Sequence, residues 1–265
     1  MNIQPTTKDN ENVLPEQVNL LTDDAFLGGE LMVLQPSGGY RAGLDAVLLA
    51  AAVSATAGRV LDLGAGVGVV GLCVARRLAD TSVTLVERER DLVELARRNV
   101  ARNGFSQKMS VVEGDIGGRA DALGLPADGF DEVCANPPYY AEADCRLPQN
   151  ALRAAAHAMP DGGLDRWARV MARLVRPGGT VRMIHRAEAL VEVLDVVGRR
   201  FGDVTVRPIH ARAGEAARRI LVSGRKGSKG PLRILPALVL HGHAGNAFRP
   251  DIQAILQGPV ALQQA

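Results

Sequence analysis

Residues 59–136 alternate short apolar segments with longer amphipathic ones, and this alternation limits the possible folds more than any other feature of the sequence. The apolar segments cover residues 60–63, 82–87, 109–115 and 130–136. Between the second and the third, residues 91–103 have the apolar spacing of a helix and are followed by a glycine. Because strands joined through helices run parallel in one sheet, the sequence predicts an α/β fold with a doubly wound, mostly parallel sheet.

The segments on either side of this alternation complete the predicted fold. Later in the chain we expect helices at 163–175 and 187–200 and strands at 180–185, 204–210 and 217–225. The linker between the last two strands is too short for a helix, so they should form an antiparallel hairpin at the edge of a seven-stranded sheet. Earlier in the chain, residues 26–35 predict a hairpin and residues 44–53 an apolar helix, which together make a small N-terminal lobe.

Three glycines, Gly64, Gly66 and Gly68, follow the first apolar strand and open a helix. Glycine permits a tight turn there and lets a ligand approach the backbone, and the helix N-terminus adds amide donors. The spacing is not that of a dinucleotide fingerprint, which needs Gly or Ala where Val69 stands. The run therefore predicts a ligand-binding loop, with a simple turn as the alternative.

Two acidic residues, Glu87 and Asp115, end the next two predicted strands. In a parallel sheet the carboxyl ends of the strands meet at one edge, where ligands bind. Glu87 could accept both hydroxyls of a ribose, and Asp115 could accept from an adenine amino group. The alternative for each is a local role, because acidic residues also favour turns at strand ends.

The fourth strand runs into the sequence Cys-Ala-Asn-Pro-Pro-Tyr-Tyr, residues 134–140. Pro137 and Pro138 lack a backbone N–H and each restricts the residue before it to extended conformations. A stiff, extended segment with free carbonyls suits a site that must present two hydrogen-bond acceptors side by side, from Asn136 and Pro137. The alternative is a turn that closes the strand without further function.

Composition and charge indicate the cellular compartment of the protein and whether it has a membrane segment or a metal site. The longest apolar run, residues 46–53, is too short to span a bilayer, and the first thirty residues hold one Lys and six acids, unlike a leader sequence. Cys73, Cys134 and Cys145 lack metal-ligand spacing and indicate a reducing compartment. The sequence thus predicts a cytoplasmic protein without a membrane segment or a metal site.

The two parts of the chain differ in charge. Residues 1–145 carry 12 Lys and Arg against 21 Asp and Glu, whereas residues 146–265 carry 19 against 8. This asymmetry predicts an anionic partner that contacts mainly the second part, although arginine-rich solvated helices are the simpler alternative. From residue 199 to residue 233 ten Lys and Arg accompany two acids, a density that could follow an RNA backbone.

The order of these motifs resembles that of class I S-adenosylmethionine-dependent methyltransferases of the amino-methylating branch. The motifs are the glycine run, the acids after the second and third strands, and the Asn-Pro-Pro-Tyr segment. The segments at residues 24–51 and 218–242 add a resemblance to the bacterial tRNA1(Val) adenine-37 N6-methyltransferase group. The resemblance covers residues 24–256. It implies a hairpin and helix closing the cofactor pocket (25–57) and a catalytic domain with a basic C-terminal extension (58–265). Residues 1–24 are polar without a sustained period, which predicts a flexible N-terminus.

The resemblance also implies roles for individual residues. The cofactor would be S-adenosylmethionine, with Glu87 on its ribose and Asp115 near its adenine. The other residues expected to hold the cofactor are Asp62, Gly64, Ala65, Gly66, Gly68, Tyr40, Arg41, Asp45 and Asn136. Of these, Arg41 could pair with the cofactor carboxylate, or could be a surface residue at the start of a helix.

An exocyclic aromatic amine is a weak nucleophile because its lone pair is delocalised into the ring. Two acceptors on its N–H groups would free that lone pair, and Asn136 and Pro137, followed by Pro138, suit this role. Tyr139 offers a face on which the target base could stack. The resemblance implies RNA, most simply adenine N6 in tRNA, contacted by the basic second part of the chain.

Other substrates and functions stay open from the sequence. They are an amine in rRNA, a protein glutamine, a small molecule or a hydroxyl group, and a module that binds the cofactor without catalysis. The basic residues expected to face RNA are Arg218, Arg219, Arg225, Lys226 and Lys229.

Overall fold

The computed structural model describes residues 21–38, 41–118, 123–138, 140–141, 158–159, 163–242, 245–258 and 260–262. The strands are β1 (Leu21–Phe26), β2 (Leu31–Pro36), β3 (Arg59–Leu63), β4 (Ser82–Glu87), β5 (Met109–Glu113), β6 (Phe130–Ala135), β7 (Tyr140–Ala141), β8 (Ala158–Met159), β9 (Val175–Arg186), β10 (Phe201–His210), β11 (Ala217–Lys226), β12 (Arg233–Ile234) and β13 (Leu238–Val239). The helices are α1 (Leu44–Ala52), α2 (Val69–Arg77), α3 (Arg90–Arg102), α5 (Gly163–Leu174), α6 (Leu190–Gly198) and α7 (Pro250–Gln257), with short 3-10 turns η1 (Leu27–Gly29) and η4 (Ala187–Ala189).

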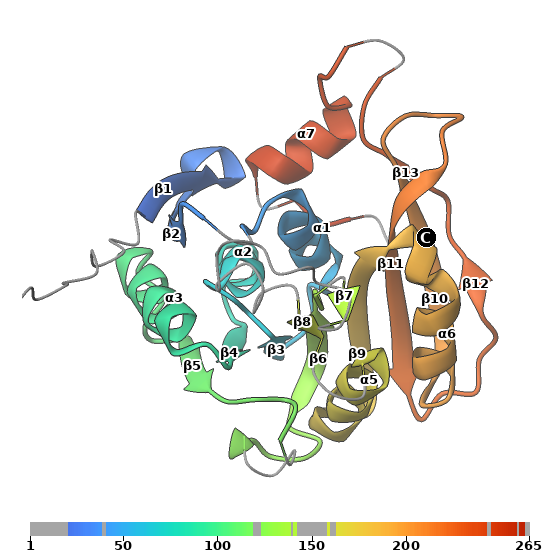
Figure 1. Ribbon diagram of the computed structural model, residues 1–265, viewed down its shortest axis with the longest axis horizontal. Coiled ribbons are helices and arrows are strands. Elements are labelled where there is room, and N and C mark those ends of the chain that lie inside the picture. Colours follow the sequence, from blue (N-terminus) through green and yellow to red (C-terminus); the bar gives the residue numbers. More distant parts are fainter. Residues whose placement is uncertain are drawn as a thin grey trace, which may run out of the picture.

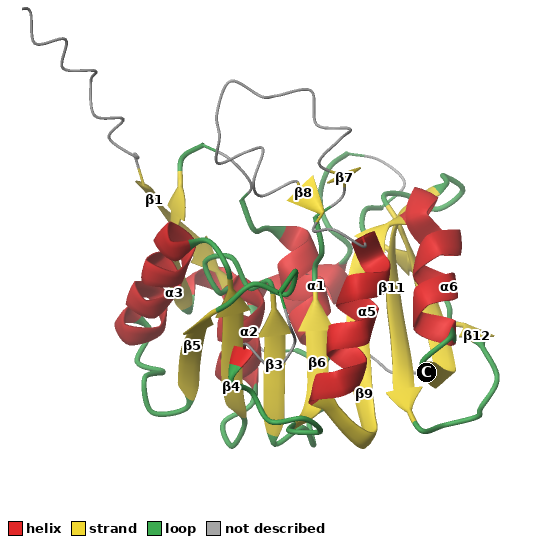
Figure 2. Cartoon of the chain, turned by 60° about the horizontal axis from the view of Figure 1, so that its bottom comes forward, coloured by secondary structure: helices red, strands yellow, loops and turns green. Residues whose placement is uncertain are grey.

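Within the described residues, the main sheet has the order β12-β10-β11-β9-β6-β3-β4-β5, and β13 also pairs with β10. Strands β9, β6, β3, β4 and β5 are parallel, whereas β11 is antiparallel to both of its neighbours. Figure 2 shows β3 and β6 running upward and β11 downward. The predicted doubly wound sheet of seven strands with an antiparallel edge hairpin is confirmed, and the two-residue strands β12 and β13 extend it.

Helices cover both faces of this sheet (Figure 1). One apolar core packs α1, α2 and α3 against one face, and includes Leu48, Leu72 and Leu85. The other packs α5 and α6 against the opposite face, around Trp167 and Met171. Since both faces are covered, the central strands are apolar on both sides, which explains their short uninterrupted apolar runs in the sequence.

A buried ion pair fixes β6 beside β9. The Arg182 guanidinium donates to the two carboxylate oxygens of Glu132 at 2.6 and 3.2 Å, and the Ser54 backbone N–H donates to the same carboxylate at 3.0 Å. Both side chains of the pair are buried. Removing one partner would leave an uncompensated buried charge, so this pair holds the strand that delivers Asn136 in one register.

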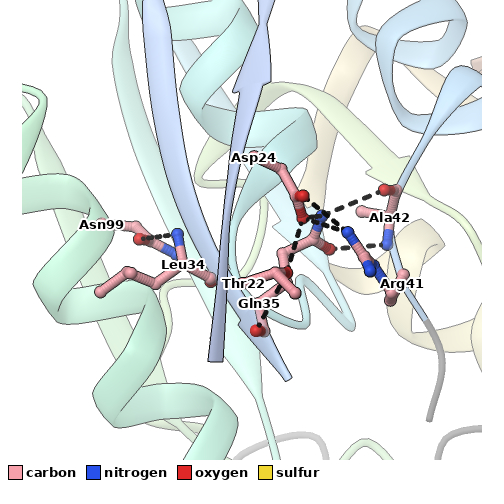
Figure 3. A network of polar contacts seen from close by, with 7 residues as sticks. All are labelled: Thr22, Asp24, Leu34, Gln35, Arg41, Ala42 and Asn99. Carbon is pink, nitrogen blue, oxygen red and sulfur yellow. Dashed lines mark hydrogen bonds and ion pairs between the residues drawn. The ribbon is translucent and has the colours of Figure 1, made fainter. Parts of the chain in front are cut away.

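The N-terminal hairpin begins at Leu21, inside the segment that the sequence assigned to a flexible N-terminus. Two asparagines of α3 hold it in place. Asn99 accepts from the Leu34 N–H at 2.8 Å (Figure 3) and donates to the Leu34 carbonyl at 3.0 Å, and Asn103 makes the same pair of bonds with Met32. These side-chain amides continue the β2 backbone pairing on the side where no further strand lies among the described residues.

Other parts of the sequence prediction stay untested. Residues 1–20 and most of the long segment 142–162 lie outside the described residues. The proposed division into three parts remains a prediction, although α1 and α7 pack together and α7 also contacts η1. Among the helices that the structure describes, none is long and apolar enough to cross a membrane.

Candidate active site

A cavity lies at the carboxyl-terminal edge of the parallel strands, where the predicted site residues were expected to meet. Segments that follow β3, β4, β5 and β6 all reach it, together with residues of β2, α1 and α5. The lining residues are Gln35, Ala42, Ala46, Asp62, Gly64, Ala65, Gly66, Val67, Val69, Val70, Val86, Glu87, Arg88, Glu89, Leu92, Gly114, Asp115, Ile116, Asn136, Pro137, Pro138 and Trp167.

The glycine loop forms one wall of this cavity. Gly64, Gly66 and Gly68 have φ values of +70°, +56° and +94°, a region that favours glycine. The N–H groups of Gly64 and Ala65 both donate to the Val86 carbonyl at 2.9 Å, so these amides are used inside the protein. The loop therefore serves mainly by its shape and close approach.

Glu87 ties this loop to the turn after β4. One carboxylate oxygen accepts from the Gly66 N–H at 2.8 Å, and the other accepts from the N–H groups of Arg88 and Glu89 at 2.8 and 3.0 Å. The side chain is 8% exposed and borders the cavity. Glu87 thus orders two walls of the cavity before any ligand arrives, a role that the sequence did not reveal.

Asp62 and Asp115 line the cavity in different surroundings. Asp62 is buried and accepts from the Gly71 N–H at 3.1 Å, and burial, with a smaller effect of the Glu87 charge, raises its pKa to about 7. Asp115 is exposed and accepts from the Gly117 N–H at 2.7 Å, which is the local turn considered as its alternative. This turn leaves its carboxylate at the cavity wall.

The Asn136–Pro137–Pro138 segment enters the cavity directly after β6, as the sequence predicted for its position. Behind it, at the end of β9, lies His185, which is 2% exposed. Burial lowers the pKa of His185 to about 4, against the opposing effect of the Pro138 and Arg186 backbones. A neutral imidazole therefore backs this segment near neutral pH.

Two residues that were predicted to hold the cofactor from the N-terminal side, Arg41 and Asp45, form ion pairs with other side chains. Arg41 pairs with both carboxylate oxygens of Asp24 at 2.6 Å, and Asp45 pairs with Arg219 at 2.9 Å (Figure 3 shows the first pair). Neither is among the described cavity residues. From this side, Gln35 and Ala42 reach the cavity instead, joined by a 2.9 Å bond from the Ala42 N–H. Tyr40 and Tyr139 lie outside the described residues.

Comparisons with known proteins agree with this geometry. Residues 42–204 match the family model of the methyltransferase small domain. The chain belongs to this family. A tRNA1(Val) (adenine(37)-N6)-methyltransferase from Aeromonas hydrophila is 32% identical over 69% of this chain and 75% of its own length. The predicted resemblance to these methyltransferases is confirmed.

Two further relatives of this methyltransferase differ in what they cover. A release factor glutamine methyltransferase from Chlorobaculum tepidum is 33% identical over 58% of this chain, and the match spans only 54% of that relative's length. The crystal structure of a predicted O-methyltransferase from Agrobacterium tumefaciens is 33% identical, covers 82% of this chain and 98% of its own, and has a TM-score of 0.69.

Membership of the methyltransferase small domain family implies S-adenosylmethionine as the cofactor, and the cavity fits this molecule. The glycine loop leaves room at Gly66, where an added Cβ would meet nothing within 4 Å. Glu87 and Asp115 supply carboxylate acceptors suited to ribose hydroxyls and an adenine amino group. Among the described residues of this methyltransferase, no group of three or more His, Cys, Asp or Glu could hold a metal ion.

Two neighbouring residues of α5, Arg166 and Trp167, belong to this site but were not predicted from the sequence. Trp167 lines the cavity, and the Arg166 guanidinium donates to the carbonyls of Ile116 and Gly117, both at 2.6 Å. Arg166 thus holds the turn that carries Asp115. A long segment separates α5 from Asn136 in sequence, so spacing could not have related these residues to the site.

Replacing Arg166 by Ala should release the turn of Ile116 and Gly117 and weaken binding of S-adenosylhomocysteine. The lost contacts are two hydrogen bonds from one charged group, so we expect an affinity about tenfold lower. Arg166→Lys should restore only part of it, because an ammonium lacks the planar fork that reaches two carbonyls. Titration calorimetry measures the affinity.

Arg169→Ala is the matched control, since Arg169 is an exposed residue of the same helix that pairs with Asp165. This variant should bind S-adenosylhomocysteine like the wild type. Equal losses in the Arg166 and Arg169 variants would mean that general weakening of α5, and not the turn, sets the affinity.

Proposed function

We propose that this protein transfers the methyl group of S-adenosylmethionine to an exocyclic amine, and that this amine is N6 of an adenine in tRNA. One observation carries the proposal. Asn136, Pro137 and Pro138 border the same cavity as Glu87 and the glycine loop, so an amine bound by these acceptors would meet the cofactor there.

The residues of the chain would bind and align the two reactants. The cofactor supplies an already activated methyl group, so alignment matters more than acid or base catalysis. The Asn136 side-chain oxygen and the Pro137 carbonyl accept from the amine and orient its lone pair. Tyr139 is proposed to stack on the target base, and a base inside folded RNA must be extruded to reach this pocket. A tRNA substrate would place the reaction in the cytoplasm.

Two substrate classes compete for this site. The tRNA-modifying relative from Aeromonas hydrophila matches over more of both chains than the glutamine methyltransferase, which favours adenine. Glutamine offers an amide nitrogen of similar geometry and is the second candidate. The Agrobacterium tumefaciens structure keeps a hydroxyl acceptor among the alternatives.

Incubation with labelled S-adenosylmethionine and separate pools of tRNA, rRNA, release-factor protein and metabolite extract would identify the acceptor. Mass spectrometry of the digested products should find N6-methyladenosine in the tRNA pool. Methylated glutamine without methylated RNA would overturn the adenine assignment, and a labelled hydroxyl product would overturn the assignment of an amine acceptor.

The predicted basic surface is divided by the direction of β11. Arg219 is opposite Arg186 at the edge where Asn136 lies, whereas Arg225 is opposite Thr180, six residues away along β11 or about 20 Å. At this far edge the Lys226 ammonium donates to the carbonyls of Ala172 and Val175 and supports the end of α5. Contact of RNA with all five of these basic residues stays a prediction, and the strand direction places Arg225 and Lys226 at a distance from Arg219.

We expect RNA to follow the near edge, past Arg218 and Arg219. Arg218 is exposed, so Arg218→Glu should weaken tRNA binding about tenfold without unfolding the protein, and should reduce the salt dependence of binding. Lys229→Glu is the matched control, since Lys229 is also exposed but lies in the turn after β11 at the far edge. Filter binding at two salt concentrations measures both effects, and a greater loss for Lys229→Glu would contradict this surface.

A further inference from the structure

Gln35 is a buried amide in the wall of the cavity, near the end of β2. The other residues of this strand are apolar, and Gln35 itself is only 2% exposed. Burying an amide costs free energy unless its polar atoms are hydrogen-bonded, and a leucine would fill this position without that cost. The bonds that the amide makes therefore explain its presence here.

Both polar atoms of the Gln35 amide bind other parts of the N-terminal region (Figure 3). Oε1 accepts from the Ala42 N–H at 2.9 Å, and Nε2 donates to the Asp24 carboxylate at 2.7 Å and to the Ala42 carbonyl at 3.4 Å. The same carboxylate accepts from the Arg41 guanidinium at 2.6 Å. Gln35 and Asp24 thus hold two consecutive residues of the segment that leads into α1.

The residue before Gln35 is linked to a different part of the cavity wall. Leu34 exchanges hydrogen bonds with Asn99 of α3, and the Asn99 amide also donates to the Val67 carbonyl in the glycine loop at 3.1 Å. Val67 and Ala42 both line the cavity. Strand β2 therefore connects two parts of this wall, the glycine loop through Asn99 and the entry to α1 through Gln35.

We propose that Gln35 is a positioning residue for cofactor binding, because it fixes the wall formed by Ala42 and Ala46 relative to the glycine loop. Gln35 acts through the backbone of Ala42 and not through a bond to the ligand. A wall that is held in place beforehand avoids the entropic cost of ordering it when the ligand binds. This inference rests on the assignment of the cavity to S-adenosylmethionine, and it adds the N-terminal hairpin to the elements that determine affinity.

Gln35→Glu tests this role, because it keeps the shape of the side chain and removes the N–H that Asp24 accepts. Two carboxylates then face each other across the 2.7 Å contact, and their repulsion should displace the Ala42 wall. We expect titration calorimetry at about pH 8 to show an affinity for S-adenosylhomocysteine about tenfold below that of the wild type.

The affinity of this variant should also depend on pH. Two adjacent carboxylates hold a proton to a higher pH than one alone, and the protonated pair again has a donor between the two side chains. Arg41, the cation that pairs with Asp24, opposes this protonation, so recovery is expected only below about pH 6. Each affinity is divided by the wild-type value at the same pH, because other charged side chains, among them Asp62 and Glu87, line the same cavity.

A second variant keeps the test valid if Gln35→Glu alone folds poorly. Adding Asp24→Asn exchanges donor and acceptor, because the new amide can donate to the new carboxylate. This double variant should bind S-adenosylhomocysteine with an affinity close to that of the wild type at the higher pH. Gln107→Glu is the matched control, since Gln107 is exposed in the turn before β5, and it should bind like the wild type at both pH values.

The outcomes separate this inference from the proposed function, since no methyl acceptor is present in these titrations. Wild-type affinity of Gln35→Glu at the higher pH would overturn the inference and leave the cofactor assignment intact, even if the variant unfolds more easily. A loss that neither the lower pH nor the double variant relieves would also overturn it. A loss that either one relieves would support the positioning role of Gln35. A wild-type protein that does not bind S-adenosylhomocysteine would overturn both the inference and the cofactor assignment.

Discussion

Replacing Asn136 by Ala should reduce methyl transfer about 10²–10³-fold while binding of S-adenosylhomocysteine stays unchanged. The substitution removes one of the two acceptors that align the amine, and misalignment or loss of one polar contact in a reacting geometry has effects of this size. Asn136 borders the cavity after β6, and shortening its side chain leaves the glycine loop and Glu87 in place. Single-turnover rates and calorimetry measure the two properties separately.

Asn136→Asp is the matched control for this change. Aspartate has nearly the same shape and keeps oxygen acceptors but lacks the amide nitrogen, so its activity should lie between those of the wild type and the alanine variant. If Asn136→Ala transferred methyl groups at the wild-type rate, the alignment mechanism would be wrong. If it lost cofactor binding to the same extent as activity, Asn136 would act through the cofactor.

Replacing Gly64 by Ala should destabilise the protein by about 2–5 kcal/mol. Its φ of +70° strains any side chain, and the new Cβ would be 2.4 Å from the Trp167 ring, which is fixed in the core. Either Trp167 or the loop must move, so affinity for S-adenosylhomocysteine should fall as well. Chemical denaturation without ligand measures the free energy of unfolding.

Gly104→Ala separates the two causes, because Gly104 has a similar φ of +76° but nothing lies within 4 Å of an added Cβ. This variant should lose only about 1–2 kcal/mol, the cost of the left-handed backbone. The difference between the two variants then reports the contact with Trp167. If both variants lost the same free energy of unfolding, Trp167 would move aside without an energetic penalty. The close contact between Gly64 and Trp167 would then not restrict this wall of the cavity.

Much of the fold could be predicted because its signals are local. The sequence predicted β4 with its observed bounds, and β3, β6 and α3 within one residue at each end, since apolar runs and helical spacing need no distant partner. The hairpin start was missed because Leu21–Phe26 holds two aspartates and is half-exposed. Its pairing with β2, and the asparagines of α3 that hold β2, are long-range contacts.

The candidate site, too, has a part that local signals predict and a part that depends on long-range contacts. The sequence by itself determined that the glycine loop, Glu87, Asp115 and Asn136 meet at one edge, because parallel strands bring their carboxyl ends together. Only the tertiary structure decided that Glu87 clamps that loop, that Trp167 closes the cavity, and that the basic residues of β11 lie at opposite edges. The roles of Glu87 and Trp167 depend on how the loops pack and on which face of the sheet α5 covers, and residue spacing along a chain encodes neither. The short linker did predict that β11 is antiparallel to β10, but the pairing of β11 with β9, which brings Arg219 to the edge of Asn136, is a long-range contact.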